Sequence, residues 1–200
     1  MSTRHPDHHQ EPPEATLIAL AATGDARALR TLYDRCEPQV RAFLLRILGP
    51  DPELDDVIQT VFIRAFGALD SFRGDSKLST WLYRICGNTC RNLIRSRYRR
   101  RRLHDALHFF TIAREGDRAH VDLGARNEAL RLLQHLRPEL REAFVLYHHE
   151  GLTIPEISAV LSLASSTVGD RLQRSRKELH KLASANPQPK LSPPLTLALG

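Results

Sequence analysis

The chain of 200 residues has only three cysteines, no long apolar run and one strongly basic stretch without a single acid. Cys36, Cys86 and Cys90 are too few and too scattered for a disulfide framework. The apolar runs fall far short of the roughly 20 residues that a membrane-spanning helix needs. The first fourteen residues are polar and lack the apolar segment of a secretory signal. These absences argue against a disulfide-stapled secreted domain and against membrane insertion, and they predict a cytoplasmic protein.

The positive charge is concentrated in one stretch. Residues 91–102 contain seven arginines and no acid, whereas residues 15–90 hold nine basic and nine acidic side chains. Together with a formal net charge of +6 and a pI near 9.6, this concentration favours a polyanionic partner. Nucleic acid is favoured over a membrane surface, because the basic stretch lacks a bulky apolar face. A solvated basic arm is the alternative interpretation of such a run.

The apolar residues follow helical spacing almost throughout, and no sustained alternation predicts a sheet. The sequence therefore predicts an all-α protein with two small helical domains, at residues 15–102 and 126–183. Residues 103–125 lack a sustained apolar period and are expected to form a flexible linker. The tails 1–14 and 184–200 are predicted to be disordered, the second because it has four prolines in seventeen residues.

Within the first domain, turn and capping signals divide the chain into helices. One helix is expected to begin near Asp25, and Pro38 is expected to interrupt, restart or kink it. Another is expected over residues 53–69. Ser79 or Thr80 is the predicted N-cap of the helix that ends in the arginines.

The second domain carries the pattern of a helix-turn-helix. Thr153 and Glu156 have the spacing of a capping box, which marks the start of a short helix over residues 155–161. A tight turn at residues 162–165 precedes a further helix that is expected to begin at Ser166. A second helix with a polar, partly basic outer face is typical of a major-groove reader, whereas a plain helical hairpin is the alternative. The outward residues suited to bases or phosphates are Ser166, Thr167, Asp170, Arg171, Gln173 and Arg174.

An acidic, partly apolar segment lies in the first domain. No basic residue occurs from Ile47 to Ile63, and four acids precede Gln59 and Phe62. Such a helix is unsuited to DNA and is expected to meet a basic protein surface. The alternative is that the acids only complement the positive end of the helix dipole. The four acids are Asp51, Glu53, Asp55 and Asp56.

The segment from Asp55 to Phe66 closely resembles region 2 of bacterial sigma factors of the extracytoplasmic-function group, in the sigma-70 family. Further stretches resemble regions 2 and 4 of that family in the same order and with similar spacing. These stretches are Phe72-Arg73-Gly74, Thr80 to Ile85, Asn88, Leu136-Arg137-Pro138, Gly151 to Ile157, and Ser166-Thr167-Val168 with Arg171-Leu172 and Arg174, whereas Gly169 and Asp170 depart from the family pattern.

The resemblance implies a factor that binds RNA polymerase core through its clamp helices and flap and reads two promoter elements. It places Asp55, Asp56, Gln59 and Phe62 at the polymerase interface. It implies that residues 70–79 capture a base flipped from the promoter strand. It also implies an anti-sigma partner, which is membrane-anchored for many relatives. The residues expected to face the minus-10 element are Lys77, Asn88, Arg91, Arg95, Arg97 and Arg99, and the outward residues of the second domain are expected to face the minus-35 element.

No pattern of a cofactor site, complete metal site or catalytic set is visible, so the sequence does not predict an enzyme. Cys86 and Cys90 lie one turn apart, which suits either half of a metal or redox site or two buried thiols. The main alternative function is a helix-turn-helix regulator that acts without polymerase. An RNA-binding adaptor is a third hypothesis, although the chain lacks clear single-strand platforms.

Overall fold

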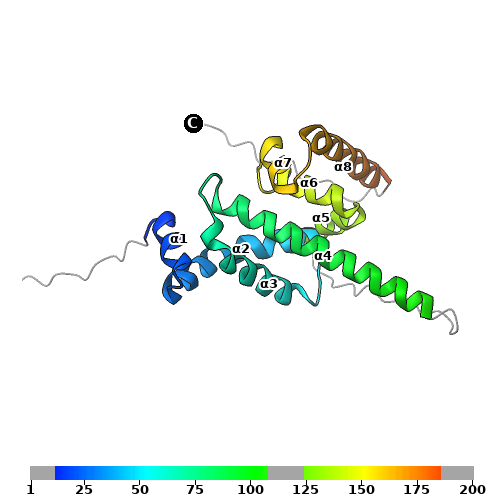
Figure 1. Ribbon diagram of the computed structural model, residues 1–200. Helices are drawn as coiled ribbons and strands as arrows, with labels where there is room; N and C mark the ends of the chain where they lie inside the picture. The colour runs from blue at the N-terminus through cyan, green and yellow to red at the C-terminus, as the bar shows by residue number, and fades with distance from the viewer. Residues whose placement is uncertain (1–11, 108–123, 186–200) are drawn as a thin grey trace, which may run out of the picture.

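The computed structural model describes residues 12–107 and 124–185, and all regular structure in these ranges is helical, as predicted. In Figure 1 the helices of the second domain gather along one flank of the long helix α4. The bounds are α1 Glu14–Ala22, α2 Ala26–Leu48, α3 Leu54–Gly67, the 3-10 helix η1 Leu69–Ser71, α4 Leu78–Leu107, α5 Gly124–His135, α6 Pro138–His148, α7 Ile154–Leu161 and α8 Ser165–Ala185. Helix α4 extends into the predicted linker, of which residues 108–123 lie outside the described ranges, as do most of the two predicted tails.

Helix α2 is continuous and is bounded by two clear local signals. The Asp25 carboxylate accepts a hydrogen bond from the Ala28 N–H at 2.8 Å, which caps the helix start. Pro38 is exposed and lies inside the helix. The helix therefore continues through Pro38, and the expectation that it is interrupted or restarted there is wrong. The helix ends at Gly49, whose φ of 79° favours glycine. A Cβ atom on Gly49 would also lie 2.9 Å from Cδ of Gln134 in α5.

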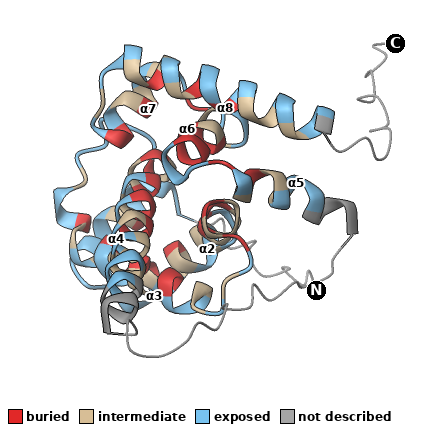
Figure 2. Cartoon of the chain, turned by 90° about the vertical axis from the view of Figure 1, so that its right-hand side faces the viewer, coloured by how far each residue is buried: buried red, intermediate tan, exposed pale blue. Residues whose placement is uncertain are grey.

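The core of the first domain is built around the buried face of α4. Leu82, Tyr83, Cys86 and Cys90 are each at most 4% exposed, and α4 packs against both α2 and α3. In Figure 2 the buried residues of the chain, drawn in red, lie mainly on the inner faces of the helices. The side chains at this helical spacing thus fix the base from which the arginines project.

Helix α4 begins earlier than the sequence predicted. Its first residue is Leu78, and the Trp81 N–H donates to the Lys77 carbonyl at 3.2 Å. Ser79 and Thr80 therefore lie in the first turn, and the prediction that one of them is the N-cap is wrong. Leu78 is only 4% exposed, and its burial in the core favours a helix that begins at this residue.

The second domain confirms the predicted capping box and turn. The Thr153 N–H donates to Oε2 of Glu156 at 2.8 Å, and the Glu156 N–H donates to Oγ1 of Thr153 at 3.4 Å. Ser162 then adopts a left-handed conformation with φ of 55°, which reverses the chain toward α8. Val168 and Leu172 anchor α8 in the core of the domain.

The two domains contact each other directly. Helix α2 packs against α5 and α6, and α4 packs against α7. Among the described helices, none has the length and apolar character required to cross a membrane.

Candidate nucleic-acid and protein interfaces

The outer face of α8 carries the polar side chains predicted to read DNA. Ser166, Asp170, Gln173 and Arg174 are exposed, and Thr167 and Arg171 are half-buried. Four of these six residues line a single cavity between α6 and α8, namely Thr167, Asp170, Arg171 and Arg174, whereas Ser166 and Gln173 lie outside it. Arg137, Glu139 and Glu178 also line this cavity, so its three arginines are matched by three carboxylates. Arg171 and Arg174 are the cations of this face suited to phosphate contact or base-edge contact.

The six residues predicted to face the minus-10 element do not share one environment. Lys77, Asn88, Arg95 and Arg99 are exposed. Arg91 and Arg97 are half-buried, and each is paired with a carboxylate of the same chain. Four of the six predicted contacts are therefore exposed in this arrangement, and Oδ1 of one of them, Asn88, accepts a hydrogen bond from Arg91.

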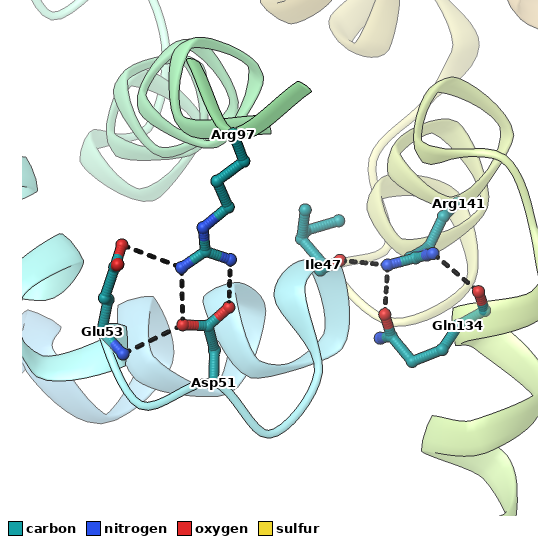
Figure 3. A network of polar contacts seen from close by, with 6 residues as sticks. All are labelled: Ile47, Asp51, Glu53, Arg97, Gln134 and Arg141. Atoms are coloured by element: carbon teal, nitrogen blue, oxygen red, sulfur yellow. Dashed lines mark hydrogen bonds and ion pairs between the residues drawn. The ribbon is translucent and has the colours of Figure 1, made fainter. Parts of the chain in front are cut away.

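Arg97 joins α4 to the connection between α2 and α3 (Figure 3). Its guanidinium pairs with both carboxylate oxygens of Asp51, one at 2.8 Å, and with Oε2 of Glu53 at 2.8 Å. The Glu53 N–H donates to Oδ1 of Asp51 at 2.9 Å, which closes the turn. The sequence predicted that these two acids meet a basic protein surface, and part of that surface is the chain's own α4.

This cluster is electrostatically well matched. The Arg97 guanidinium lowers the pKa of the Asp51 carboxyl, and Asp51 in turn raises the pKa of Arg97. The Asp51 side chain is only 8% exposed, so solvent screens the pair weakly. A bidentate pair of this kind fixes geometry as well as adding energy.

The outer face of α3 combines exposed acids with apolar surface. Asp55, Asp56 and Gln59 are exposed, and they line a groove together with Tyr33 and Ile63. Ile63 is 67% exposed, which is unusual for a large aliphatic side chain. Arg41 also lines the groove and forms an ion pair with Asp55 at 2.7 Å. Two exposed acids and an exposed isoleucine beside this arginine form a surface suited to a partly basic, partly apolar protein partner.

Sequence reasoning placed Phe62 at this interface and missed Ile63. Phe62 is 4% exposed and packs its ring against Tyr33 and Phe66, at centroid distances of 4.5 and 5.6 Å. It lies beneath the groove, which it helps to line. The position of Ile63 one helical turn after Gln59, away from the apolar stripe, is the signal that identifies it as exposed.

The cysteines have the environment of structural thiols. Cys86 and Cys90 are almost fully buried, and burial raises the pKa of Cys86 and raises that of Cys90 to about 12. Within the described residues, no group of three or more histidine, cysteine or acidic side chains is placed to hold a metal ion.

These features are typical of one class of protein: a two-domain helical DNA-binding factor with a helix-turn-helix in one domain and, in the other, an exposed groove suited to a protein partner. Two family models match the chain, Sigma-70 region 2 over residues 32–100 and Sigma-70, region 4, over residues 126–179. These matches fall on the two domains described above.

Curated relatives agree over most of the chain's length. The chain is 33% identical over 175 residues to the RNA polymerase sigma-H factor of Pseudomonas aeruginosa, covering 82% of this chain and 91% of the relative. It is 31% identical over 176 residues to the ECF RNA polymerase sigma-E factor of Escherichia coli, covering 83% of this chain and 92% of the relative.

Solved structures share the fold. The structure of CnrH in complex with the cytosolic domain of CnrY has a TM-score of 0.62 at 30% identity, covering 86% of this chain and 97% of that one. The sigma factor RpoE from Bartonella quintana, in complex with the anti-sigma factor NepR, has a TM-score of 0.63 at 24% identity, covering 78% of this chain and 97% of that one. At this identity the similarity supports the fold alone. The chain belongs to the sigma-70 family, and within it to the extracytoplasmic-function group of RNA polymerase sigma factors. The family prediction is thus confirmed.

Proposed function

We propose that this chain docks on RNA polymerase core through the groove on α3 and directs initiation at promoters through α4 and α8. The observation that carries the proposal is the groove with exposed Asp56, Gln59 and Ile63, which lies in the same chain as two separate basic surfaces. A regulator that binds DNA alone has no use for such a groove, which disfavours the alternative function.

The two DNA surfaces have different assigned roles. Exposed Asn88 and Arg95 on α4, with Lys77 before it, are assigned to the minus-10 element. Arg171 and Arg174 on α8 are assigned to the minus-35 element. The exposed Arg99 is assigned to sequence-independent phosphate contact.

Two further assignments follow from the family. The solved complex of CnrH with the cytosolic domain of CnrY supports a protein partner for this chain, which we assign as an anti-sigma factor. We assign the chain a non-enzymatic role in the cytoplasm, where RNA polymerase acts.

Run-off transcription with purified core and a promoter library tests the function and its specificity together. Replacing Asp56 and Gln59 by alanine should abolish both core binding in a pull-down and transcription. Asp34→Ala, at an exposed acid of α2 outside the groove, is the control and should retain both. If the double variant bound core with unchanged affinity, the groove on α3 would not be the docking surface.

A further inference from the structure

Asp170 is an acid in the middle of a surface that is assigned to DNA. It is exposed on α8 and lines the same cavity as Arg171 and Arg174. A carboxylate repels phosphate, so Asp170 cannot make the sequence-independent contacts that suit the two arginines. A DNA-reading helix with an acid at this place loses affinity unless the acid meets a hydrogen-bond donor of the partner.

The buried residues of α8 determine the direction in which Asp170 points. Val168 is fully buried and Leu172 is 3% exposed, and both pack into the hydrophobic core. Because successive residues of a helix are rotated by about 100°, Asp170 lies about 160° from each of these two side chains. Asp170 is therefore at the middle of the outward face, and Ser166 and Arg174 lie one turn before and one turn after it.

The Asp170 carboxylate forms no hydrogen bond or ion pair with any residue of the ranges that the structure describes. Arg174 follows at a spacing that permits an ion pair along a helix, yet the two side chains are not paired. Asp170 is also the sixth residue of α8, beyond the first turn in which an acid stabilises the helix dipole. Neither local role accounts for this acid, which leaves a role toward the partner.

Gly169 leaves open space beside this carboxylate. A Cβ atom at Gly169 would have no neighbour within 4 Å, so packing within the chain does not require a glycine here. Glycine is also unfavourable within a helix. The aspartate side chain is short, so α8 must approach the base edges closely for the carboxylate to reach them. A residue without a side chain next to Asp170 permits that approach.

The major groove offers a carboxylate only two kinds of donor, the amino groups of cytosine and of adenine. Adenine presents its N7 acceptor beside the amino group, and this acceptor repels a carboxylate. Cytosine presents its N4 amino group without an acceptor of the same base beside it. Guanine and thymine present only acceptors among their polar atoms, so they would leave the carboxylate desolvated and unpaired. This chemistry favours cytosine over the other three bases.

We propose that Asp170 reads a cytosine in the minus-35 element by accepting a hydrogen bond from the N4 amino group of that base. The assignment of α8 to this element rests on the proposed function. Arg171 and Arg174 supply attraction to DNA, and Asp170 supplies discrimination between bases. Because Gly169 and Asp170 depart from the family pattern, this base preference belongs to this chain and not to the family as a whole.

Run-off transcription with polymerase core and a promoter library randomised across the minus-35 element tests the proposal. The unmodified chain should select cytosine at one position of the element. Asp170→Ala should lose this preference and keep the preferences at the other positions, because the exposed Asp170 supports no contact within the described fold. Glu128→Ala removes the same charge from an exposed site of α5 and should keep all preferences. Retention of the cytosine preference by Asp170→Ala would overturn the proposal.

Asparagine at this position tests the chemistry of the side chain. Asp170→Asn keeps nearly the same shape, but its amide both accepts and donates hydrogen bonds, which suits the N6 and N7 atoms of adenine. In the same library, the preferred base should therefore change from cytosine to adenine. An Asp170→Asn variant that prefers cytosine as strongly as the unmodified chain would contradict a contact made by the carboxylate.

N4-methylcytosine at the selected position tests the donor atom of the base. Its methyl group replaces the amino hydrogen that faces the major groove and leaves the Watson–Crick pair in place. Polymerase core with the unmodified chain should bind the methylated promoter duplex about tenfold more weakly than the unmethylated duplex, which is the size of one specific base contact. With Asp170→Ala the two duplexes should bind equally. Equal binding of both duplexes with the unmodified chain would overturn the proposal.

The promoter library also separates this inference from the proposed function. If the chain with polymerase core transcribes some promoters but no position of the minus-35 element favours cytosine, the inference is wrong and the proposed function stands. If no promoter of the library is transcribed, the proposed function is wrong and the inference falls with it.

Discussion

Neighbouring arginines of α4 have different roles although the sequence presents them as one block. Arg97 is half-buried and paired with Asp51 and Glu53, whereas Arg99 is exposed two residues further on. Because 100° of helical rotation separates successive residues, a basic run of this length cannot point to one partner. Arg97 is therefore expected to support the fold, and Arg99 to contact phosphate.

Exchanging each arginine for lysine should separate these roles. Arg97→Lys retains the charge but loses the bidentate geometry, so we expect a loss of about 1–2 kcal/mol in the free energy of unfolding. Urea titration followed by circular dichroism measures it. Arg99→Lys is the matched control and should unfold at the same urea concentration as the unmodified chain. A larger loss for Arg99→Lys would contradict the assignment.

The Asp51 carboxyl should make the free energy of unfolding decrease as the pH falls. Its pKa is lowered in the fold by the hydrogen bonds of Arg97, so the carboxylate stabilises the fold at pH values above its unfolded pKa of about 3.9. That stabilisation is lost as the pH falls from about 4 through the lower folded pKa. The difference in urea midpoint between the unmodified chain and Asp51→Asn should therefore shrink between pH 5 and pH 3. A constant difference would show that the ion pair is not its cause.

The thiols should differ in reactivity according to burial. Burial raises the pKa of all three thiols, which disfavours the reactive thiolate, but Cys36 is only half-buried whereas Cys86 and Cys90 are at most 1% exposed. With a thiol reagent at pH 8, the native chain should show one early phase, which Cys36→Ser removes. The same phase should persist in the Cys86→Ser, Cys90→Ser variant, and all three thiols should react after unfolding.

At the scale of single elements, the start of α7 depends on a purely local capping interaction. Thr153 and Glu156 exchange hydrogen bonds within four residues. Thr153→Ala should lower the free energy of unfolding by about 1 kcal/mol, because the Glu156 N–H loses its acceptor. Thr153→Ser keeps the hydroxyl and should restore most of the stability. Equal losses in the two variants, measured by thermal unfolding, would point to the methyl group and not to the cap.

Such local devices explain what could be predicted from the sequence. The capping box and the turn before α8 depend on residues within a few positions of one another, so the motif alone predicted them correctly. The start of α4 at the buried Leu78 and the pairing of Arg97 with Asp51 depend on contacts with distant parts of the chain. No pattern within one segment specifies such distant partners, which is why the sequence predicted DNA-facing arginines and missed this pairing.

At the scale of the whole molecule, two domains that each match their own family model also contact one another. The sequence predicted the two domains because each has its own apolar periodicity. The contact between Arg91 and Glu142 could not be predicted, because it joins residues 51 positions apart across a linker. Which arginines are available to DNA therefore depends on how the domains are arranged.

The exposed arginines near the end of α4 should set the salt dependence of binding. Replacing Arg99 and Arg100 by alanine removes two cations from an exposed surface. The slope of log affinity against log salt should fall by about 2, and all promoters should weaken to a similar extent. Measuring the polymerase-bound factor on several promoters checks this. Loss confined to one promoter would indicate direct base contact instead.

Arg141 makes exchange of domains between relatives difficult. Its guanidinium is buried at the contact between α6 and α2, where burial lowers its pKa to about 10. It donates to the Leu136 carbonyl at 2.9 Å within its own domain, and to the Ile47 carbonyl of the other (Figure 3). A chimera that joins this second domain to a foreign first domain would keep the buried cation but lose the acceptor at the end of α2. Modular promoter readers built from this chain would therefore need position 141 redesigned together with the residues around Gly49.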